Sequence, residues 1–269
     1  MRGHEPMRVR DAKILITGAT GGLGRELATA MAAGGGELIL TGRRTDSLEP
    51  LARTLGGKAI PADLADPAEV ERLLAAAGEV DIVVANAALP AGGLLTDRSI
   101  DEIDRVLDVN LRAPIVMAKV AAQRMAARRR GHLVFISSIS GKTASGHLSL
   151  YNATKFGLRG FALALREDMR PHNVGVSTVF PGYIRDAGMF ADSGATLPRG
   201  VGTRSPRDVA RVTIRAIELN RAEIDVAPLG LRAIAVLGGA APSLSAAIQR
   251  RLGAEAVSRQ LAEGQRDKR

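Results

Sequence analysis

The sequence predicts an α/β fold: a doubly wound, seven-stranded, mainly parallel sheet with helices on both faces. Short apolar runs of strand-forming residues alternate along the chain with longer stretches that have helical spacing. The strand runs are almost continuously apolar, which is typical of strands that are buried on both faces. No linker, composition shift or internal repeat divides the chain, so we expect residues 1–269 to form one domain.

Six apolar runs predict strands, and a seventh is weaker because a proline interrupts it. The six are 13–17, 37–41, 81–86, 132–137, 174–180 and 223–228, and the weaker one is 58–63. Helical spacing covers 22–33, 45–55, 67–77, 101–130, 150–170 and 206–220. Two of these helices begin with a capping residue followed by proline, in Asp66–Pro67 and Ser205–Pro206. Ligands of such sheets bind beyond the carboxyl ends of the strands, so the residues that follow the strands should surround one crevice.

Both ends of the chain depart from this alternation. Residues 1–11 contain no apolar segment and are predicted to be a loose arm. No run of about 18 apolar residues occurs, which argues against a membrane-spanning helix and favours a cytoplasmic location. Residues 229–252 are apolar with interspersed arginines and predict two amphipathic helices broken near Gly238–Pro242, followed by a polar tail over 253–269.

The charge and composition narrow the class of partner. A net charge of +9 raises nucleic acid, an anionic membrane surface or a phosphorylated ligand as partners. The arginines are dispersed, and their densest run, 128–130, follows a predicted helix, where cations complement the helix dipole. Only 3% of the residues are aromatic, so base stacking is disfavoured and no nucleic acid partner is expected. The chain has no cysteine and its four histidines lack metal-site spacing, so we expect neither thiol catalysis nor a metal site.

A glycine-rich turn follows the first predicted strand. In TGATGGLG, Gly18, Gly22 and Gly24 let the backbone turn tightly and approach a pyrophosphate, whose charge then lies at a helix N-terminus. The lysine of a P-loop is missing, which argues against hydrolysis of a nucleoside triphosphate. The turn therefore predicts that the chain binds a dinucleotide.

The end of the second predicted strand indicates which dinucleotide is bound. Proteins that prefer the ribose 2′-hydroxyl place a carboxylate there, whereas this chain has Gly42 followed by Arg43 and Arg44. An arginine binds a 2′-phosphate through charge-assisted hydrogen bonds, so we predict NADP(H) over NAD(H); the same arginines also suit a solvated turn. Asp63, after the third predicted strand, suits two roles equally: accepting a hydrogen bond from the adenine amine, or capping the next helix.

A serine, a tyrosine and a lysine complete a recognisable pattern. Ser138 closes the fifth predicted strand, thirteen residues before Tyr151, which lies one helical turn before Lys155. With the glycine turn, this S-x12-Y-x-x-x-K pattern resembles the short-chain dehydrogenase/reductase family over roughly residues 11–228. Further matching positions are Asn86–Ala87 after the fourth strand, Asn110 in a helix and Pro181–Gly182 after the sixth strand.

The resemblance implies a Rossmann-type oxidoreductase in which Tyr151 is the general acid and base. A hydride that moves to a carbonyl carbon leaves an oxyanion in need of a proton, and a free phenol with a pKa of about 10 is a poor proton relay at neutral pH. A nearby ammonium favours the phenolate, so Lys155 is expected to lower the pKa of Tyr151. The resemblance further implies that Ser138 holds the substrate oxygen and that Asn110 supports a water-mediated proton path to Lys155. The implied catalytic residues are Ser138, Tyr151, Lys155 and Asn110. The implied cofactor contacts are Gly18, Thr20, Gly22, Leu23, Gly24, Arg43, Arg44, Asp63, Leu64, Asn86, Ala87, Tyr151, Lys155, Pro181, Gly182 and Ile184.

Three features depart from the family pattern. Ala85 and Ala88 occupy the outer positions of an Asn-Asn-Ala-Gly motif, and alanine adopts positive φ less readily than glycine. Gly21 stands where NADP-preferring members often have a basic residue, so the phosphate would depend on the two arginines after the second strand. In the family a threonine contacts the nicotinamide at the place where this chain has Arg-Asp, at 185–186. The backbone of 183–184 could supply the contact instead.

The substrate side of the crevice is predicted from the segments that are least regular. Residues 183–204 form a long connection without strong periodicity and are predicted to be a substrate loop or lid. Met189, Phe190 and Leu197 are either walls of the substrate pocket or the packing of a surface loop. The extension 229–269 is expected to be a lid or a subunit interface in preference to a membrane contact.

The function predicted from these features is an NADP(H)-dependent oxidoreductase that interconverts a ketone or aldehyde, apolar in character, with an alcohol. The alternative is an NADP(H)-binding regulator without turnover, which the intact serine, tyrosine and lysine disfavour. The helices 101–130 and 150–170 resemble those through which family members form dimers and tetramers, so a homodimer or homotetramer is expected.

Overall fold

Seven strands form one sheet in the computed structural model, which describes residues 7–198 and 200–265. The strands are β1 Lys13–Thr17, β2 Glu37–Thr41, β3 Lys58–Ala59, β4 Ile82–Ala85, β5 Gly131–Ile136, β6 Val174–Pro181 and β7 Glu223–Val226. Their order is β3-β2-β1-β4-β5-β6-β7, and all neighbouring strands are parallel, which confirms the predicted fold class. The order reverses between β1 and β4, so the carboxyl ends of these strands flank the crevice where such sheets bind ligands.

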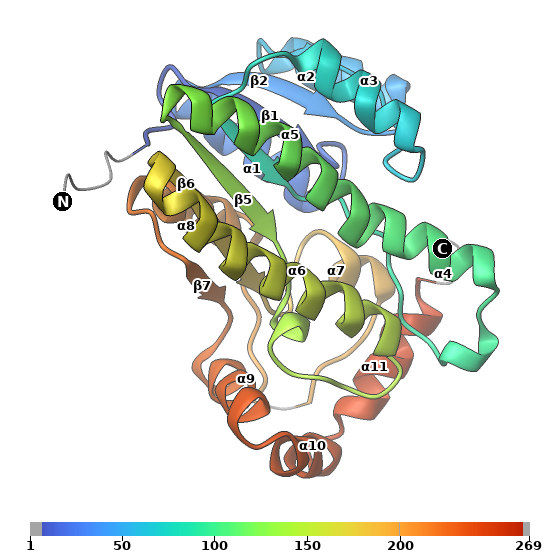
Figure 1. The fold of residues 1–269 in the computed structure, drawn as a ribbon. Coiled ribbons are helices and arrows are strands. Elements are labelled where there is room, and N and C mark those ends of the chain that lie inside the picture. The colour runs from blue at the N-terminus through green and yellow to red at the C-terminus, as the bar shows by residue number, and fades with distance from the viewer. Residues whose placement is uncertain (1–6, 199, 266–269) are drawn as a thin grey trace.

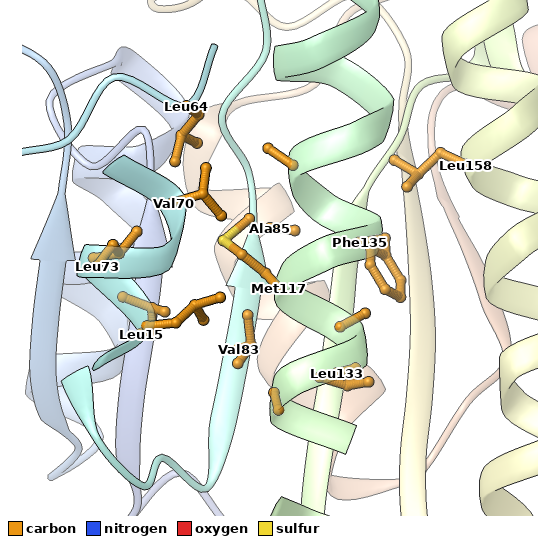
Figure 2. Close-up of a cluster of buried hydrophobic side chains, with 14 of the residues drawn as sticks. Leu15, Leu64, Val70, Leu73, Val83, Ala85, Met117, Leu133, Phe135 and Leu158 are labelled. Carbon is orange, nitrogen blue, oxygen red and sulfur yellow. The ribbon is translucent and has the colours of Figure 1, made fainter. Parts of the chain in front are cut away.

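Helices cover both faces of the sheet, as predicted (Figure 1). One face carries α1 Gly22–Ala33, α2 Thr45–Thr54 and α8 Pro206–Glu218, and the other carries α3 Pro67–Ala77, α5 Ala113–Arg128 and α6 Ser149–Met169. Ile14 lies in the first core and Leu15 in the second, because successive side chains of a strand point to opposite faces. Figure 2 shows the second core, in which Met117 of α5 lies among side chains of the sheet and α3. Burial on both sides explains why the strands read as continuous apolar runs.

The helix predicted over 101–130 is interrupted by one wider turn. It consists of α4 Ile100–Leu107, a π-helical turn over Asp108–Arg112 and then α5. Proline has no N–H, so Pro114 cannot donate the regular helical hydrogen bond to the carbonyl of Asn110. The amide of Ala113 instead bonds the carbonyl of Asp108, five residues earlier. The wide turn places Asn110, 1% exposed, on the side facing the sheet end.

The third strand is shorter than predicted. β3 ends at Ala59 because Pro61 breaks the ladder, although the amides of Ile60 and Ala62 still bond the carbonyls of Leu40 and Gly42. The chain therefore continues alongside β2 without the regular pairing of a strand.

The two ends of the chain differ from the sequence-based expectations. In the predicted N-terminal arm, residues 1–6 lie outside the described residues, whereas Met7 and Val9 are buried in the core beneath α1. The C-terminal extension contains three helices instead of two and a tail: α9 Leu229–Ala240, α10 Pro242–Arg251 and α11 Ala254–Glu263. The prediction of a polar tail was wrong for the residues of α11. This segment is charged, but it forms a helix that buries Val257 and Ala262 on one face.

The extension lies at the carboxyl end of the sheet. Figure 1 shows α9, α10 and α11 beyond the tip of the β5 arrow, with the short helix α7 Met189–Ser193 beside α11. None of the helices in the described part of the chain is both long and apolar enough to cross a membrane. The extension therefore adds a third element, besides the sheet and its covering helices, around the ligand-binding edge.

Candidate active site

The glycine turn between β1 and α1 has a shape that only glycine fits. Gly18 has a φ of 64°, and a Cβ there would lie 2.8 Å from the Cα of Ala87. A Cβ on Gly24 would overlap the carbonyl oxygen of Gly18, so the first turn of α1 packs directly on the loop. A Cβ on Gly22 would lie 2.5 Å from the Cβ of Ala187, so the segment after β6 closes over the turn.

The N-terminus of α1 suits a bound phosphate. Its N-cap is Gly21, which has no side chain to accept hydrogen bonds from the first amides, and its first turn contains no acidic residue. By contrast, Asp66 caps α3, Ser99 caps α4 and Ser205 caps α8. Uncapped amides and the positive end of the helix dipole attract an anion, so the turn fits the pyrophosphate of a dinucleotide.

The asparagine after β4 fastens two strand ends together. The amides of Asn86 and Ala87 both donate to the Thr17 hydroxyl at 3.0 Å, and Nδ2 of Asn86 donates to the Thr17 carbonyl at 2.9 Å. Positive φ does not occur at Ala85 or Ala88, so alanine causes no backbone strain at these positions. Thr17 was missed in the sequence, where it read only as the last residue of a strand.

The two arginines after β2 lie open to solvent at the edge of the crevice. Arg43 and Arg44 are exposed, and within 7–198 and 200–265 neither forms an ion pair. A Cβ on Gly42 would lie 3.3 Å from the Thr20 hydroxyl, so the end of β2 borders the glycine turn. Gly42 supplies no carboxylate at the end of β2, and the two exposed guanidinium groups are available to an anionic ligand.

Asp63 does not cap the helix that follows it, and its predicted hydrogen bond to the adenine amine stays a prediction. The cap of α3 is Asp66, whose carboxylate accepts the amide of Ala68 at 2.8 Å. The Asp63 carboxylate accepts Nη2 of Arg105 at 2.8 Å and the amide of Ala65 at 3.0 Å. Burial raises the pKa of Asp63, but the hydrogen bonds from Arg105 and Ala65 outweigh it and keep the pKa below its ordinary value. The neighbouring Leu64 is buried in the core that Figure 2 shows.

Ser138, Tyr151 and Lys155 meet at the carboxyl end of β5. Ser138 follows β5 and hydrogen-bonds Tyr151, which lies in the first turn of α6. Nζ of Lys155 lies 5.6 Å from the centre of the Tyr151 ring and donates to the carbonyl of Ile136 at 3.1 Å. The lysine is 2% exposed, so its ammonium ties α6 to the strand end in a nearly dry environment.

Burial moves the pKa values of the tyrosine and the lysine in opposite directions. It raises the pKa of Tyr151 to about 12, even though the hydrogen bond with Ser138 acts to lower it. It lowers the pKa of Lys155 to about 8. The expectation that Lys155 lowers the pKa of Tyr151 is not met in this state, because desolvation favours the neutral form of both groups. The pair therefore holds a protonated phenol, ready to donate.

Asn110 is bonded to the backbone opposite it and not to the lysine. Its Oδ1 accepts the amide of Leu89 at 2.7 Å, and its Nδ2 donates to the Leu89 carbonyl at 3.0 Å. These two bonds fix the loop after β4 against the π-helical turn. A role for Asn110 in a water path to Lys155 stays a prediction.

A second asparagine, missed in the sequence, positions the loop after Ser138. Nδ2 of Asn152 donates to the carbonyls of Ser140 and Thr143 at 2.7 and 3.1 Å. Its position directly after Tyr151 was the available signal, since both residues share the first turn of α6. Asn152 thereby joins α6 to the segment that carries Ser138.

The segment after β6 forms another border of the site. Pro181 ends β6, and the amide of Gly182 donates to the carbonyl of Val226 at 3.1 Å. Ile184 is buried and pairs with Arg204 across the segment. Arg185 and Asp186 form an exposed ion pair at 3.3 Å, so their side chains do not line the site.

A cavity of about 180 Å³ opens beside Ser138 and Tyr151. Ser138, Tyr151 and Gly182 form one end, and Tyr183 packs against Phe190 with ring centres 5.1 Å apart. Met189, Phe190 and Leu197 line the cavity, which is one of their two predicted roles. The loops after β4 and β5 and the helices α9, α10 and α11 contribute further parts of the wall. No group of metal-ligating side chains occurs in the part of the chain that the structure describes.

The chain is similar to known proteins over most of its length. The family model for short chain dehydrogenase matches residues 12–197. Dehydrogenase/reductase SDR family member 7B of Bos taurus is 33% identical over 244 residues, covering 81% of this chain and 74% of that protein. Ketoacyl reductase HetN of Nostoc sp. is 30% identical over 222 residues, covering 79% of this chain and 77% of that protein. A solved short-chain dehydrogenase from Sphingobium yanoikuyae in complex with NADPH has a TM-score of 0.75 at 25% identity, over 87% of this chain and 95% of that chain.

Proposed function

Because the chain belongs to the short-chain dehydrogenase/reductase family and is an oxidoreductase that acts on CH–OH and C=O groups, we propose that its cofactor is NADP(H). The proposed reaction interconverts a ketone or aldehyde with an alcohol by hydride transfer. Tyr151 is the proposed general acid in reduction and the general base in oxidation. The observation that carries the proposal is the meeting of Ser138, Tyr151 and Lys155 at the carboxyl end of β5, where Ser138 and Tyr151 line the cavity.

The side chains divide the work between orientation and proton transfer. The reduced nicotinamide, when bound, supplies the hydride to the carbonyl carbon. The hydroxyl of Ser138 donates a hydrogen bond to the carbonyl oxygen, and the Tyr151 hydroxyl gives that oxygen its proton as charge develops. Lys155, one turn along α6, offers positive charge to the phenolate that remains, so the raised pKa of the buried Tyr151 is offset when the proton leaves.

The preference for NADP(H) rests on the end of β2. Arg43 and Arg44 are exposed there without ion-pair partners among the described residues, and Gly42 supplies no carboxylate. A 2′-phosphate would accept charge-assisted hydrogen bonds from these guanidinium groups. The structural neighbour bound to NADPH supports the same cofactor.

The test follows NADPH oxidation with a panel of ketones and aldehydes, in the wild-type protein and in Tyr151→Phe. Removing the hydroxyl should lower kcat by about 100-fold or more, because general acid catalysis contributes about 10²–10⁴. NADPH binding by Tyr151→Phe, measured by titration, serves as the control and should be retained. Full turnover by this variant would refute the mechanism, and NADPH binding without turnover of any carbonyl compound would favour the non-catalytic regulator.

A further inference from the structure

The cavity has a catalytic end and a wall that the C-terminal extension builds. Leu231 and Ile234 come from α9, and Val257 and Leu261 come from α11. This extension lies outside residues 12–197, the part that matches the family model. The wall is therefore a feature of this chain to be interpreted from its own residues.

We propose that the substrate is an uncharged, predominantly apolar carbonyl compound whose body lies against α9 and α11, with Ser258 bonding an uncharged polar group on it. This proposal rests on the proposed function, because the carbonyl is placed at Ser138 and Tyr151. It adds the chemical class of the substrate and a residue that selects within that class.

The cavity wall carries no charge among the residues that the structure describes. Its side chains are aliphatic, aromatic, hydroxyl or amide groups, although the whole chain contains 37 Lys and Arg and 28 Asp and Glu. A carboxylate or phosphate placed against this wall would lose its hydration and gain no cation in return. An aliphatic or alicyclic body would bury its surface against the wall at no such cost.

The extension is held firmly enough to define this wall. Nε2 of Gln265, just after α11, donates to the carbonyl of Met189 at 2.7 Å, and Oε1 of Gln260 accepts the amide of Thr196 at 2.9 Å. α10 is held by Gln249, whose amide bonds the loop that follows Ser138. These bonds join the extension to both sides of the cavity.

Ser258 is the side chain on α11 that offers a polar contact. It is 3% exposed and lines the cavity, and its hydroxyl makes no hydrogen bond to any residue within 7–198 or 200–265. The glutamines nearby are already used: Gln249 bonds Ser145 and Ala144, and Gln265 bonds Met189. This hydroxyl faces the cavity without a partner among the described residues, so it can bond a hydroxyl or carbonyl group on the substrate body.

α9 offers a matched pair of positions for a test. Ile234 lines the cavity, whereas Val236, two residues later, is 72% exposed on the outer side of the helix. Ile234→Arg introduces a cation into the cavity, and Val236→Arg adds the same charge to the same helix in water.

The experiment compares methyl octyl ketone with its ω-carboxylate analogue as substrates of the NADPH-loaded enzyme. The wild-type protein should favour the uncharged ketone by at least about 100-fold in kcat/KM, because an unpaired carboxylate is costly to bury. Ile234→Arg should cut this preference by about tenfold or more, while Val236→Arg should leave it unchanged. Equal turnover of both substrates by the wild-type protein, or equal effects of Ile234→Arg and Val236→Arg on the preference, would overturn the proposal.

Ser258 is tested with hydroxylated analogues of the same ketone, the hydroxyl being moved along the chain. At least one analogue should have a lower KM than the parent ketone, and Ser258→Ala should remove that advantage, so that the KM of this analogue is no longer below that of the parent ketone. Calorimetric binding of the alcohol products to Tyr151→Phe gives a readout that needs no turnover. If no carbonyl compound is reduced, the proposed function fails; if reduction occurs but charged and uncharged analogues bind alike, only the substrate class fails.

Discussion

Lys155→Met removes an ammonium that the fold buries between α6 and β5. Burial lowers the pKa of Lys155 from 10.5 to about 8, so the unfolded chain holds this proton more tightly than the folded one. One pKa unit corresponds to about 1.4 kcal/mol, so the buried charge costs about 3 kcal/mol of folding stability at neutral pH. Stability therefore rises with pH between the two pKa values, and the cost should shrink by roughly 2 kcal/mol between about pH 7 and about pH 9.5.

The variant lacks this pH-dependent cost. Relative to the wild type, Lys155→Met should lose about 2 kcal/mol of stability as the pH rises over that interval. Urea unfolding of both proteins at the two pH values measures the change. The hydrogen bond to the carbonyl of Ile136 is lost from the variant at both pH values, so it does not contribute to the difference.

Lys119→Met is the matched control, since Lys119 is exposed on α5 and its ammonium stays in water. The difference between this control and the wild type should be the same at both pH values. If the Lys155→Met difference also changes by less than about 0.5 kcal/mol, the lysine is not desolvated in the folded protein and the argument from burial is wrong.

Three other variants test the cofactor turn and the loops beside it. Replacing Arg43 and Arg44 by glutamate should weaken NADPH binding by about 10- to 100-fold in a titration and change NADH binding little; equal losses would refute the assignment. Gly24→Ala should abolish the rise in melting temperature that NADPH produces, because the added Cβ overlaps the carbonyl of the turn; a retained rise would show that the turn adapts. Asn110→Ala should cost about 2–4 kcal/mol in urea unfolding, since it leaves both backbone groups of Leu89 buried without partners, and a loss below about 1 kcal/mol would contradict this.

The sequence predicted the sheet well because its strands are buried on both faces. Ile14 and Leu15 belong to different cores, and that requirement is visible in the sequence as two adjacent apolar residues. The glycine turn was equally readable, since Gly18 and Gly24 meet steric limits that no other residue satisfies. Both signals are local, so one sequence was enough to read them.

Features that depend on contacts between distant segments were not predictable in the same way. The charged pattern of 253–269 did not predict α11, because this helix packs against the segment 189–197, which is distant in the sequence. Asn110 bonds Leu89, and nothing in the spacing of the two residues announces this contact. The pKa of Tyr151 depends on how completely it is desolvated, which the four-residue spacing to Lys155 does not express. The oligomeric state stays a prediction for the same reason.

The cavity has an optical consequence. The chain contains no tryptophan and only two tyrosines, Tyr151 and Tyr183, and both line the cavity. Its tyrosine emission therefore arises from two phenol rings at one place in the molecule. A ligand that enters the cavity changes the surroundings of both emitters, whereas a change on the far side of the sheet alters neither. The protein carries a label-free reporter of its own cavity, and ligand binding can be followed by intrinsic fluorescence without an attached dye.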